Sequence, residues 1–262
     1  MIGAVVYKLR AENSGRLSLI NGRLMHAAFF KILNEFAPTL EKFIHNELTI
    51  KPFTVSFLDP AKKIPSVSGH WQVRRGDEFF WRITGLNEEI LRAILSVPLH
   101  QKVQVGALSL TVENATDDII AIEDFILSVK NVPSVSEICF EFVSPVTFRI
   151  DNFDAPYPRA ELIFASLADK WSQAAMPAAV DKKVIRELAA KIRLTEWTGQ
   201  SKKFYFGHDR GTLAFWGKFL YSVDALNDSA QKVFLLLAKF GEFAGVGRLT
   251  GQGFGQVRVD FK

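Results

Sequence analysis

The sequence has one cysteine, Cys139, in 262 residues, and it has no long uncharged run. A single cysteine cannot form an internal disulfide, which excludes a disulfide-rich secreted scaffold. The longest stretches without Asp, Glu, Lys or Arg span ten residues, as at 103–112, whereas a membrane-spanning helix needs about 20. The opening residues MIGAVVYK carry neither the basic leader nor the apolar core of an export signal. We therefore expect a cytoplasmic protein without a membrane anchor.

Patterns of metal ligands are also missing from the sequence. The five histidines lie far apart along the chain, and the cysteine has no partner. Pairs of carboxylates such as Glu88-Glu89 and Glu123-Asp124 fall where helices are expected to begin, so capping explains them. We expect no metal and no cofactor.

The excess of basic charge is small, but it is concentrated in one stretch. The net charge is +4, from 32 basic and 28 acidic residues. The stretch 181–210 has eight basic and four acidic residues, so it carries the whole excess (8 − 4 = +4). Such a stripe favours a polyanionic partner, although a solvated helix face is the alternative. The basic residues are Lys182, Lys183, Arg186, Lys191, Arg193, Lys202, Lys203 and Arg210.

The first half of the chain has a pattern typical of a mixed fold. Residues 2–10 are rich in Val, Ile and Leu and predict a strand, whereas Met25, Phe29, Ile32 and Phe36 repeat with helical spacing. The order is strand, helix, strand, strand, helix, strand, which is the split βαβ unit of ferredoxin-like domains. The expected elements are strands at 2–10, 52–58, 78–83 and 101–113, and helices at 23–36, 39–46 and 88–96, the last capped by Asn87. On the helix at 39–46, Leu40, Phe43 and Ile44 are expected to face inward.

The same order recurs in the second half. We therefore predict an α+β fold of two tandem ferredoxin-like, RRM-like domains, at 1–130 and 135–262, with the joint near the Asn, Pro and Ser cluster of 128–136. The expected elements are strands at 138–150, 203–206, 212–223 and 257–261, and helices at 160–170, 181–194 and 227–243.

The segment 245–255 contains five glycines in eleven residues. Glycine loses more backbone entropy on folding than other residues, so this many glycines destabilise the segment unless they have a purpose. We expect some of them to adopt backbone angles that other residues avoid, or to allow another backbone to approach closely. No lysine follows the glycines as in a Walker A loop, and a strand pattern rather than a helix follows Gly255, which excludes a dinucleotide fingerprint. Backbone amides together with Arg248 suit a nucleic-acid backbone, and a tight structural connection is the alternative.

This terminal pattern resembles that of a known family. Gly-Val-Gly, five residues and Gly-Phe-Gly at 245–255 are similar to the terminal loop of the CRISPR-associated endoribonucleases that process repeat RNA into guide RNA, which belong to the RAMP superfamily. The segments FEFVSPVTFR at 140–149 and FIHNELTIKPFTVS at 43–56 resemble the same family. The resemblance extends over essentially the whole chain and implies tandem ferredoxin-like domains and RNA cleavage.

Two histidines are candidates for proton transfer. On a helical wheel, His26 lies beside the stripe of Met25 and Phe29, and His45 lies beside Leu40 and Ile44, so both are expected at the edge of a core. From spacing alone, each is better explained as a histidine at the surface or at the boundary of the core than as a catalytic residue. The resemblance implies that His45 is an acid–base residue with Lys51 at the family's lysine, and that His26 is a second histidine.

One position departs from the family pattern. Phe30 stands where some members have a tyrosine on the first helix, so a Tyr–His–Lys triad is incomplete. The resemblance implies a metal-independent endoribonuclease in which the 2′-hydroxyl attacks the phosphate with histidine acid–base catalysis. The implied cleavage reaction leaves a 2′,3′-cyclic phosphate on one RNA product and a 5′-hydroxyl on the other.

Repeat RNA (pre-crRNA) is the expected partner, and proteins of a CRISPR effector complex are further candidates for a chain that is monomeric or homodimeric. The alternatives are a non-cleaving RNA-binding subunit of such a complex and a general RNA-binding protein. The expected RNA contacts are Arg23, Lys182, Lys183, Arg186, Lys202, Lys203, Gly245, Gly247, Arg248, Gly253 and Gly255.

Overall fold

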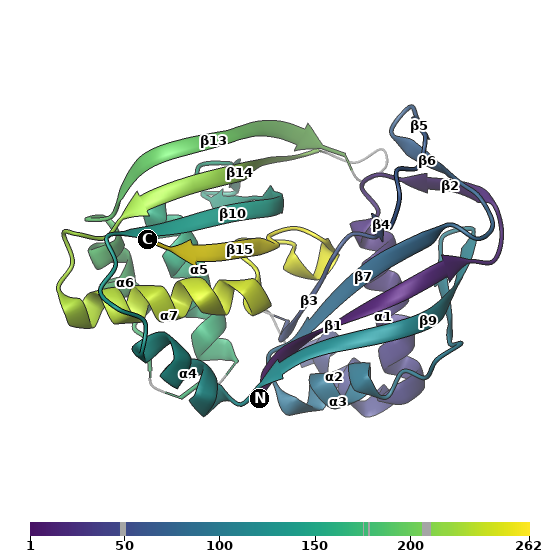
Figure 1. Cartoon of the computed structure of the whole chain (residues 1–262), viewed down its shortest axis with the longest axis horizontal. Helices are drawn as coiled ribbons and strands as arrows, with labels where there is room; N and C mark the ends of the chain where they lie inside the picture. Colours follow the sequence, from purple (N-terminus) through teal and green to yellow (C-terminus); the bar gives the residue numbers. More distant parts are fainter. Residues whose placement is uncertain (48–50, 175, 178, 206–210) are drawn as a thin grey trace. The chain divides into compact units, whose positions relative to one another are not determined.

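The computed structural model describes residues 1–47, 51–174, 176–177, 179–205 and 211–262, with the backbone alone at 45–47. These residues form two compact units (Figure 1). Unit 1 contains Met1–Ile119 together with Gly251–Gly253, and unit 2 contains Ile120–Thr250 together with Phe254–Lys262. Three residues of the glycine-rich segment are therefore grouped with the first half of the chain.

Unit 1 is built on an antiparallel sheet in the order β3-β7-β1-β9-β8, with β4 paired to β7. The first strand lies between the third and fourth strands of the split βαβ unit, which is the ferredoxin-like arrangement. The core elements are β1 (Ile2–Ala11), α1 (Gly22–Phe36), β3 (Phe53–Val55), β7 (Glu78–Gly85), α3 (Glu88–Leu95) and β9 (Leu108–Ile120). The additional elements are β2 (Gly15–Ser18), α2 (Pro38–Glu47), β4 (Asp59–Pro60), β5 (Ser66–Val67), β6 (His70–Val73) and β8 (Lys102–Val105).

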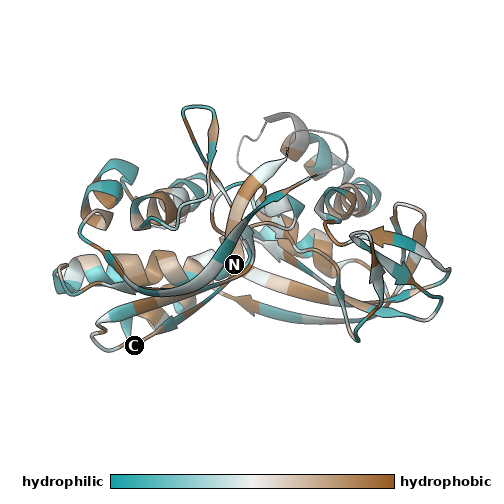
Figure 2. Ribbon diagram, turned by 90° about the horizontal axis from the view of Figure 1, so that it is seen from above, coloured by the Kyte–Doolittle hydropathy of each residue, from teal (hydrophilic) through white to brown (hydrophobic). Residues whose placement is uncertain are grey.

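Alternation along the strands explains how this sheet buries one face. Val5, Tyr7 and Leu9 of β1 are buried, and Lys8 and Arg10 between and beyond them face outward. The helices α1 and α3 pack against the sheet on the buried face. Figure 2 shows the same pattern as alternating hydrophobic and hydrophilic segments along the long strands.

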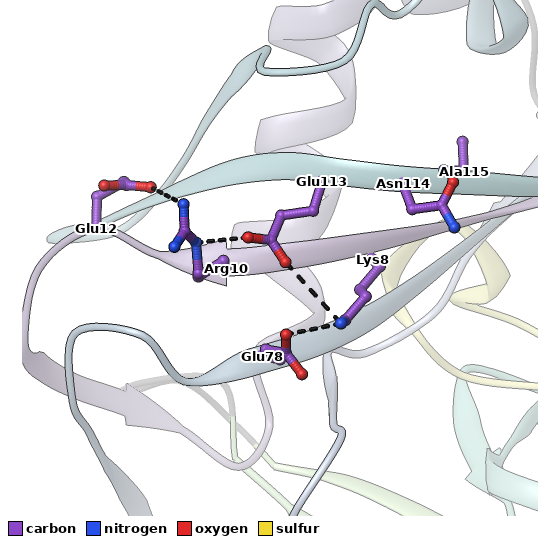
Figure 3. Close-up of polar contacts among 7 residues, drawn as sticks. All are labelled: Lys8, Arg10, Glu12, Glu78, Glu113, Asn114 and Ala115. Atoms are coloured by element: carbon purple, nitrogen blue, oxygen red, sulfur yellow. Dashed lines mark hydrogen bonds and ion pairs between the residues drawn. The ribbon is translucent and has the colours of Figure 1, made fainter.

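The outward face of this sheet carries a ladder of charged pairs (Figure 3). Lys8 Nζ lies 2.6 Å from Glu78 Oε1 on β7 and 4.0 Å from Glu113 Oε2 on β9, and Arg10 Nε lies 2.6 Å from Glu113 Oε1. The hydrogen bond between Lys8 and Glu78 raises the pKa of the lysine and lowers that of the carboxyl. Such exposed pairs contribute little stability each, but opposite charges on neighbouring strands favour this register.

Unit 2 repeats the arrangement with the sheet order β13-β14-β10-β15. Again the first long strand lies between the third and the fourth, so the prediction of two tandem ferredoxin-like domains is confirmed. The helices α5, α6 and α7 lie on one face of this sheet (Figure 1). The elements are α4 (Ile122–Lys130), β10 (Glu137–Val146), β11 (Phe148–Ile150), β12 (Phe153–Ala155), α5 (Ala160–Gln173), α6 (Lys182–Ala189), β13 (Arg193–Phe204), β14 (Thr212–Ser222), α7 (Asp228–Ala244), the 3-10 turn Thr250–Gln252 and β15 (Val257–Phe261).

Aromatic side chains fill the core between this sheet and its helices. The Phe164 ring on α5 lies 4.6 Å from Phe234 on α7 and 5.7 Å from Phe140 on β10, with edge-to-face contacts in both cases. Aromatic pairs prefer this geometry and add to the burial of their surface. The helices, including α7, which leads into the glycine-rich segment, are thereby fixed to the sheet.

Several expectations from the sequence were wrong in detail. The helix expected at 181–194 ends at Ala189. Of the strand expected at 203–206, residues 203–204 are the end of β13, which begins at Arg193, and residue 206 lies outside the described residues. The strand expected at 101–113 is a hairpin of β8 and β9 that turns at Gly106, where φ is +60°. Phe43 was expected to face inward, and its side chain is 51% exposed. The extra strands β2, β5 and β6, which form a separate small sheet, were not expected.

Candidate functional site

His26 lies on α1 in unit 1, one residue after the fully buried Met25, and it is half-buried as the helical wheel predicts. Its Nδ1 atom lies 2.8 Å from the carbonyl oxygen of Gly251. A carbonyl oxygen can only accept a hydrogen bond, so the imidazole donates from Nδ1. A histidine predicted from the first helix thus meets a residue of the terminal glycine-rich segment.

Two aromatic rings confine this imidazole. The Phe30 ring, one turn further along α1, lies 4.7 Å from the His26 ring, and the Phe53 ring on β3 lies 6.2 Å from it in a stacked arrangement. Phe30 and Phe53 also contact each other edge to face at 5.9 Å. Contacts with these two neighbouring rings restrict the rotation of His26 about its side-chain bonds, which favours a defined orientation for proton transfer.

The turn that carries Gly251 is seated against the start of α1. A Cβ atom on Gly22 would lie 1.7 Å from the carbonyl oxygen of Gln252, so only glycine allows this approach. Gly253 has a φ of +88° and forms an isolated parallel bridge with Ser56. A Cβ on Gly253 would lie 2.6 Å from the Phe57 ring. The glycines of this turn therefore serve close packing in unit 1.

The remaining glycines of the segment belong to unit 2 and are held by backbone hydrogen bonds. The Gly245 amide caps α7 by donating to Gly241, and Val246 donates to the Gly255 carbonyl. The Gly247 amide donates to Ser166 Oγ, and the Gly255 amide donates to the Pro145 carbonyl. These amide hydrogens are used inside the protein, and the φ angles of Gly245, Gly247 and Gly255, at +64°, +75° and +75°, explain why glycine stands there. Contact of these glycines with RNA stays a prediction.

Lys170 on α5 is a buried residue of this region that the sequence analysis missed. Its Nζ atom donates to the carbonyl oxygens of Ala244 and Gly245 at 3.0 and 2.9 Å and lies 3.5 Å from Thr250 Oγ1. Burial lowers the pKa of this ammonium to about 7. A cation at a helix C-terminus is favourable, and it fixes both ends of the stretch 245–250. Its place on the buried stripe of α5, beside Trp171, was the available signal.

Lys51 lies just before β3 and points back toward α2. Its ammonium group donates to the carbonyl of Ile44, which belongs to the peptide bond leading into His45. Partial burial lowers the pKa of Lys51. The structure therefore brings Lys51 to the backbone at His45. His45 lies on α2, and its side chain is outside the described part of the chain.

The predicted RNA-contacting cations are exposed or partly exposed. Arg23 is exposed on α1, one turn before His26. Lys182 pairs with Asp169 at 2.5 Å, and Arg248 pairs with Asp154 at 3.5 Å. Ion pairs between exposed groups of this kind are weak. The other exposed members are Lys183 and Arg186 on α6, and Lys202 and Lys203 on β13.

Two absences hold for the described residues. Among them, no group of three or more His, Cys, Asp or Glu side chains is arranged to hold a metal ion. Within the same residues, none of the helices has both the length and the apolar character to cross a bilayer. His208 and Arg210 fall outside the described residues.

One exposed aromatic side chain on the edge strand β13 was also missed. The Trp197 side chain is 59% exposed and stacks on the buried Phe219 ring at 6.0 Å. An exposed indole on a strand that carries two lysines near its end offers a flat surface for a nucleobase.

The chain is similar to known proteins over both units. A model described as the CRISPR Cas6 N-terminal domain matches residues 1–116, and a model described as the CRISPR-associated endoribonuclease Cas6 matches residues 140–257. The CRISPR-associated endoribonuclease Cas6 of Mycobacterium tuberculosis is 29% identical over 127 residues, which cover 48% of this chain and 40% of that protein. The match thus spans less than half the length of this curated relative.

Solved structures of the same family share the fold. A Cas6 product complex superposes with a TM-score of 0.77 and 24% identity, covering 99% of this chain and 100% of that one. Thermus thermophilus Cas6 gives a TM-score of 0.70 with 23% identity, covering 99% and 98% of the two chains. The two matching models describe the two domains of one family, and they follow each other along the chain as in the resemblance that the sequence motifs indicated. They show that the chain belongs to the Cas6 family of CRISPR-associated endoribonucleases.

Proposed function

We propose that this chain is a metal-independent endoribonuclease that cleaves CRISPR repeat transcripts (pre-crRNA). The observation that carries the proposal is the half-buried His26, held by its Nδ1 atom at Gly251 and packed beside the rings of Phe30 and Phe53. Histidine can gain or lose a proton near neutral pH, so an imidazole held in a defined orientation suits proton transfer. Family membership and the likeness to Cas6 complexes with product and with substrate mimic support the choice of substrate.

The proposed reaction uses the nucleophile that RNA carries itself. A base takes the proton of the 2′-hydroxyl, the 2′-oxygen attacks the adjacent phosphorus in line, and an acid protonates the departing 5′-oxygen. His26 and His45 exchange these protons, and each well-placed group contributes about 10²–10⁴ in rate. Lys51 and Arg23 stabilise the negative charge that develops on the phosphate. The products are a 2′,3′-cyclic phosphate and a 5′-hydroxyl end.

RNA affinity is proposed to come from phosphate contacts with the basic residues. Lys182, Lys183 and Arg186 lie in one short helix, and Lys202 and Lys203 lie at the end of one strand. Clusters of this kind hold the sugar–phosphate backbone without reading sequence. Proteins of a CRISPR effector complex are further proposed partners.

The proposal is tested by single and double substitutions, His26→Ala and His45→Ala, with repeat RNA and EDTA present. We expect each single variant to cut at least 10²-fold more slowly, and a 2′-deoxy nucleotide at the scissile position to abolish cutting without loss of binding. His70→Ala is the matched control, because His70 also bonds a carbonyl through Nδ1, at 2.9 Å from Ser68, in the small β2-β6-β5 sheet. Cutting by the double variant at the parental rate would overturn the site assignment.

A non-cleaving RNA-binding subunit is the second candidate. Phe30 favours it, because a ring without a hydroxyl lies 4.7 Å from His26 where some family members have a tyrosine. Tight binding of repeat RNA with no cleavage, with or without divalent metal, would establish this reading and exclude the first.

A further inference from the structure

The contact between His26 and Gly251 defines the protonation of the imidazole. Its acceptor is a backbone carbonyl oxygen, which has no proton to give, so Nδ1 must carry a hydrogen whenever the 2.8 Å bond is made. In a neutral imidazole only one nitrogen carries a hydrogen. The bond therefore selects the tautomer in which Nε2 is unprotonated.

This acceptor is held in place by packing on three sides. The carbonyl oxygen of Gln252 lies close to the Cα of Gly22. A Cβ atom on Gly22 would lie 1.7 Å from that oxygen and 2.8 Å from the Phe57 ring. On the other side, a Cβ on Gly251 would lie 3.2 Å from the Phe53 ring and 3.4 Å from His26 Nδ1. The bridge between Ser56 and Gly253 anchors the next residues. The position of the Gly251 carbonyl is thus closely defined by its neighbours.

We propose that the turn Thr250–Gln252 acts as a tautomer clamp, in which the Gly251 carbonyl holds His26 in its Nδ1–H form so that Nε2 exchanges the proton during RNA cleavage. This inference rests on the proposed function. Gly22 is a positioning residue, because its missing side chain lets the turn reach the imidazole. Neither Gly22 nor the role of the Gly251 carbonyl follows from the sequence pattern.

The clamp also supports the charged form of the ring. When Nε2 takes the 2′-hydroxyl proton, the new bond joins the 2′-oxygen to phosphorus, the bond from phosphorus to the 5′-oxygen breaks, and a second acid protonates that oxygen. His26 is then an imidazolium, and its Nδ1–H bond to the Gly251 carbonyl becomes charge-assisted and stronger. The carbonyl thus acts as the orienting third group behind a base, as carboxylates do in nucleophilic triads.

The tautomer is read directly from the side-chain nitrogen signals of histidine by NMR, on the full chain labelled with ¹⁵N. At a pH where the ring is neutral, we expect His26 to show a protonated Nδ1 and an unprotonated Nε2, with the signals assigned by their loss in His26→Ala. A protonated Nε2 would overturn the clamp. This measurement needs no RNA, so it stands even if the chain does not cleave.

The role of Gly22 is tested by Gly22→Ala. The added Cβ must displace the turn, so we expect the tautomer preference of His26 to be lost and single-turnover cleavage to fall about 10²-fold, the usual effect of a misplacement near 1 Å, with little change in RNA affinity. Gly15→Ala is the control, because that glycine has no positive φ and a Cβ there would meet only the end of the Leu108 side chain, at 3.0 Å. Parental cleavage and an unchanged His26 tautomer in Gly22→Ala would overturn the positioning role.

Replacements of His26 separate the clamp from folding and from catalysis. The amide of His26→Asn can occupy the place of Nδ1 and donate to Gly251, whereas the amide of His26→Gln extends to the place of Nε2. We expect His26→Asn to keep the parental melting temperature and His26→Gln to melt lower, with cleavage abolished in both. Equal melting temperatures would show that the Gly251 bond is not made. Cleavage retained in both, with the expected tautomer in the parent, would instead contradict the proposed function.

Discussion

Lys170 is a single side chain that organises a long stretch of backbone. Its buried ammonium group donates to two carbonyls at the end of α7, and Asp169, its neighbour in sequence, pairs with Lys182 instead. A buried cation has a large desolvation cost, which hydrogen bonds to the helix end offset in part. The cost appears as a pKa lowered from 10.5 to about 7.

This pKa predicts a specific pH dependence of stability. Between about pH 7 and 10.5 the unfolded chain holds a proton on Lys170 that the folded chain has released, so the free energy of unfolding rises with pH across this range and the gain disappears as pH falls to 7. Lys170→Met should remove this rise. Urea unfolding of both proteins at pH 7 and pH 9 measures it, with Lys102→Met, an exposed lysine, as the control. An equal rise in parent and Lys170→Met would contradict the assignment.

At the residue scale, the sequence placed His26 correctly but missed what it touches. Helical spacing shows that a residue next to Met25 lies at the border of the buried stripe, because the helix period is regular. The same reasoning failed for Phe43, which is exposed on α2. Gly251 lies 225 positions from His26 in the sequence, and no local pattern encodes a contact at that separation.

At the element scale, the capping signal of Asn87 was reliable, whereas the edge strand was largely missed. Asn87 caps α3 as predicted, because its side chain accepts from the Ile90 amide at 2.9 Å. β13 has no buried face for most of its length, so the alternation of apolar and polar residues that identifies strands is absent. Its pairing with β14 supplies the structure that its own side chains do not specify.

Asn87→Ala is expected to destabilise the protein by about 1 kcal/mol, since one amide at the start of α3 loses its acceptor. Chemical unfolding measures this change, and RNA cleavage should be unaffected. Asn114→Ala is the matched control, because Asn114 accepts only from the next residue, Ala115, on the exposed end of β9 (Figure 3). Similar decreases in stability in both variants would show that the cap contributes nothing particular.

At the scale of the whole molecule, the sequence predicted the fold because both halves alternate strands and helices in one order. Each half closes a four-strand core whose first strand lies in the middle. The inserted strands β2, β5 and β6 were not predicted, because they are two to four residues long and lie largely outside the buried core. Short exposed strands carry too little periodicity to be recognised.

The distribution of charge predicts how RNA binding depends on salt. Replacing four lysines of the basic stretch with alanine should weaken binding broadly and flatten the plot of log K against log salt, by about one unit of slope for each phosphate that is no longer neutralised. Binding titrations between 50 and 200 mM salt, a range in which phosphate binding responds strongly, measure this effect. The four are Lys182, Lys183, Lys202 and Lys203.

A control with the same change of charge separates direct binding from net charge. We expect it to leave the salt slope close to that of the parent, because its cations lie outside α1, α2 and the basic stretch. A parental slope in the first variant would mean that its lysines are ordinary solvated surface. The control replaces Lys62, Lys63, Arg92 and Lys102, which are all exposed.

The hidden amine of Lys170 also has a practical consequence. Acylating reagents modify amines that water can reach, so a brief treatment labels the surface lysines and spares this one until α5 and the end of α7 separate. The growth of its acylated peptide with time, followed by mass spectrometry, then records how often that junction opens. The acylation rate of Lys170 thus measures how often the contact between α5 and the end of α7 opens.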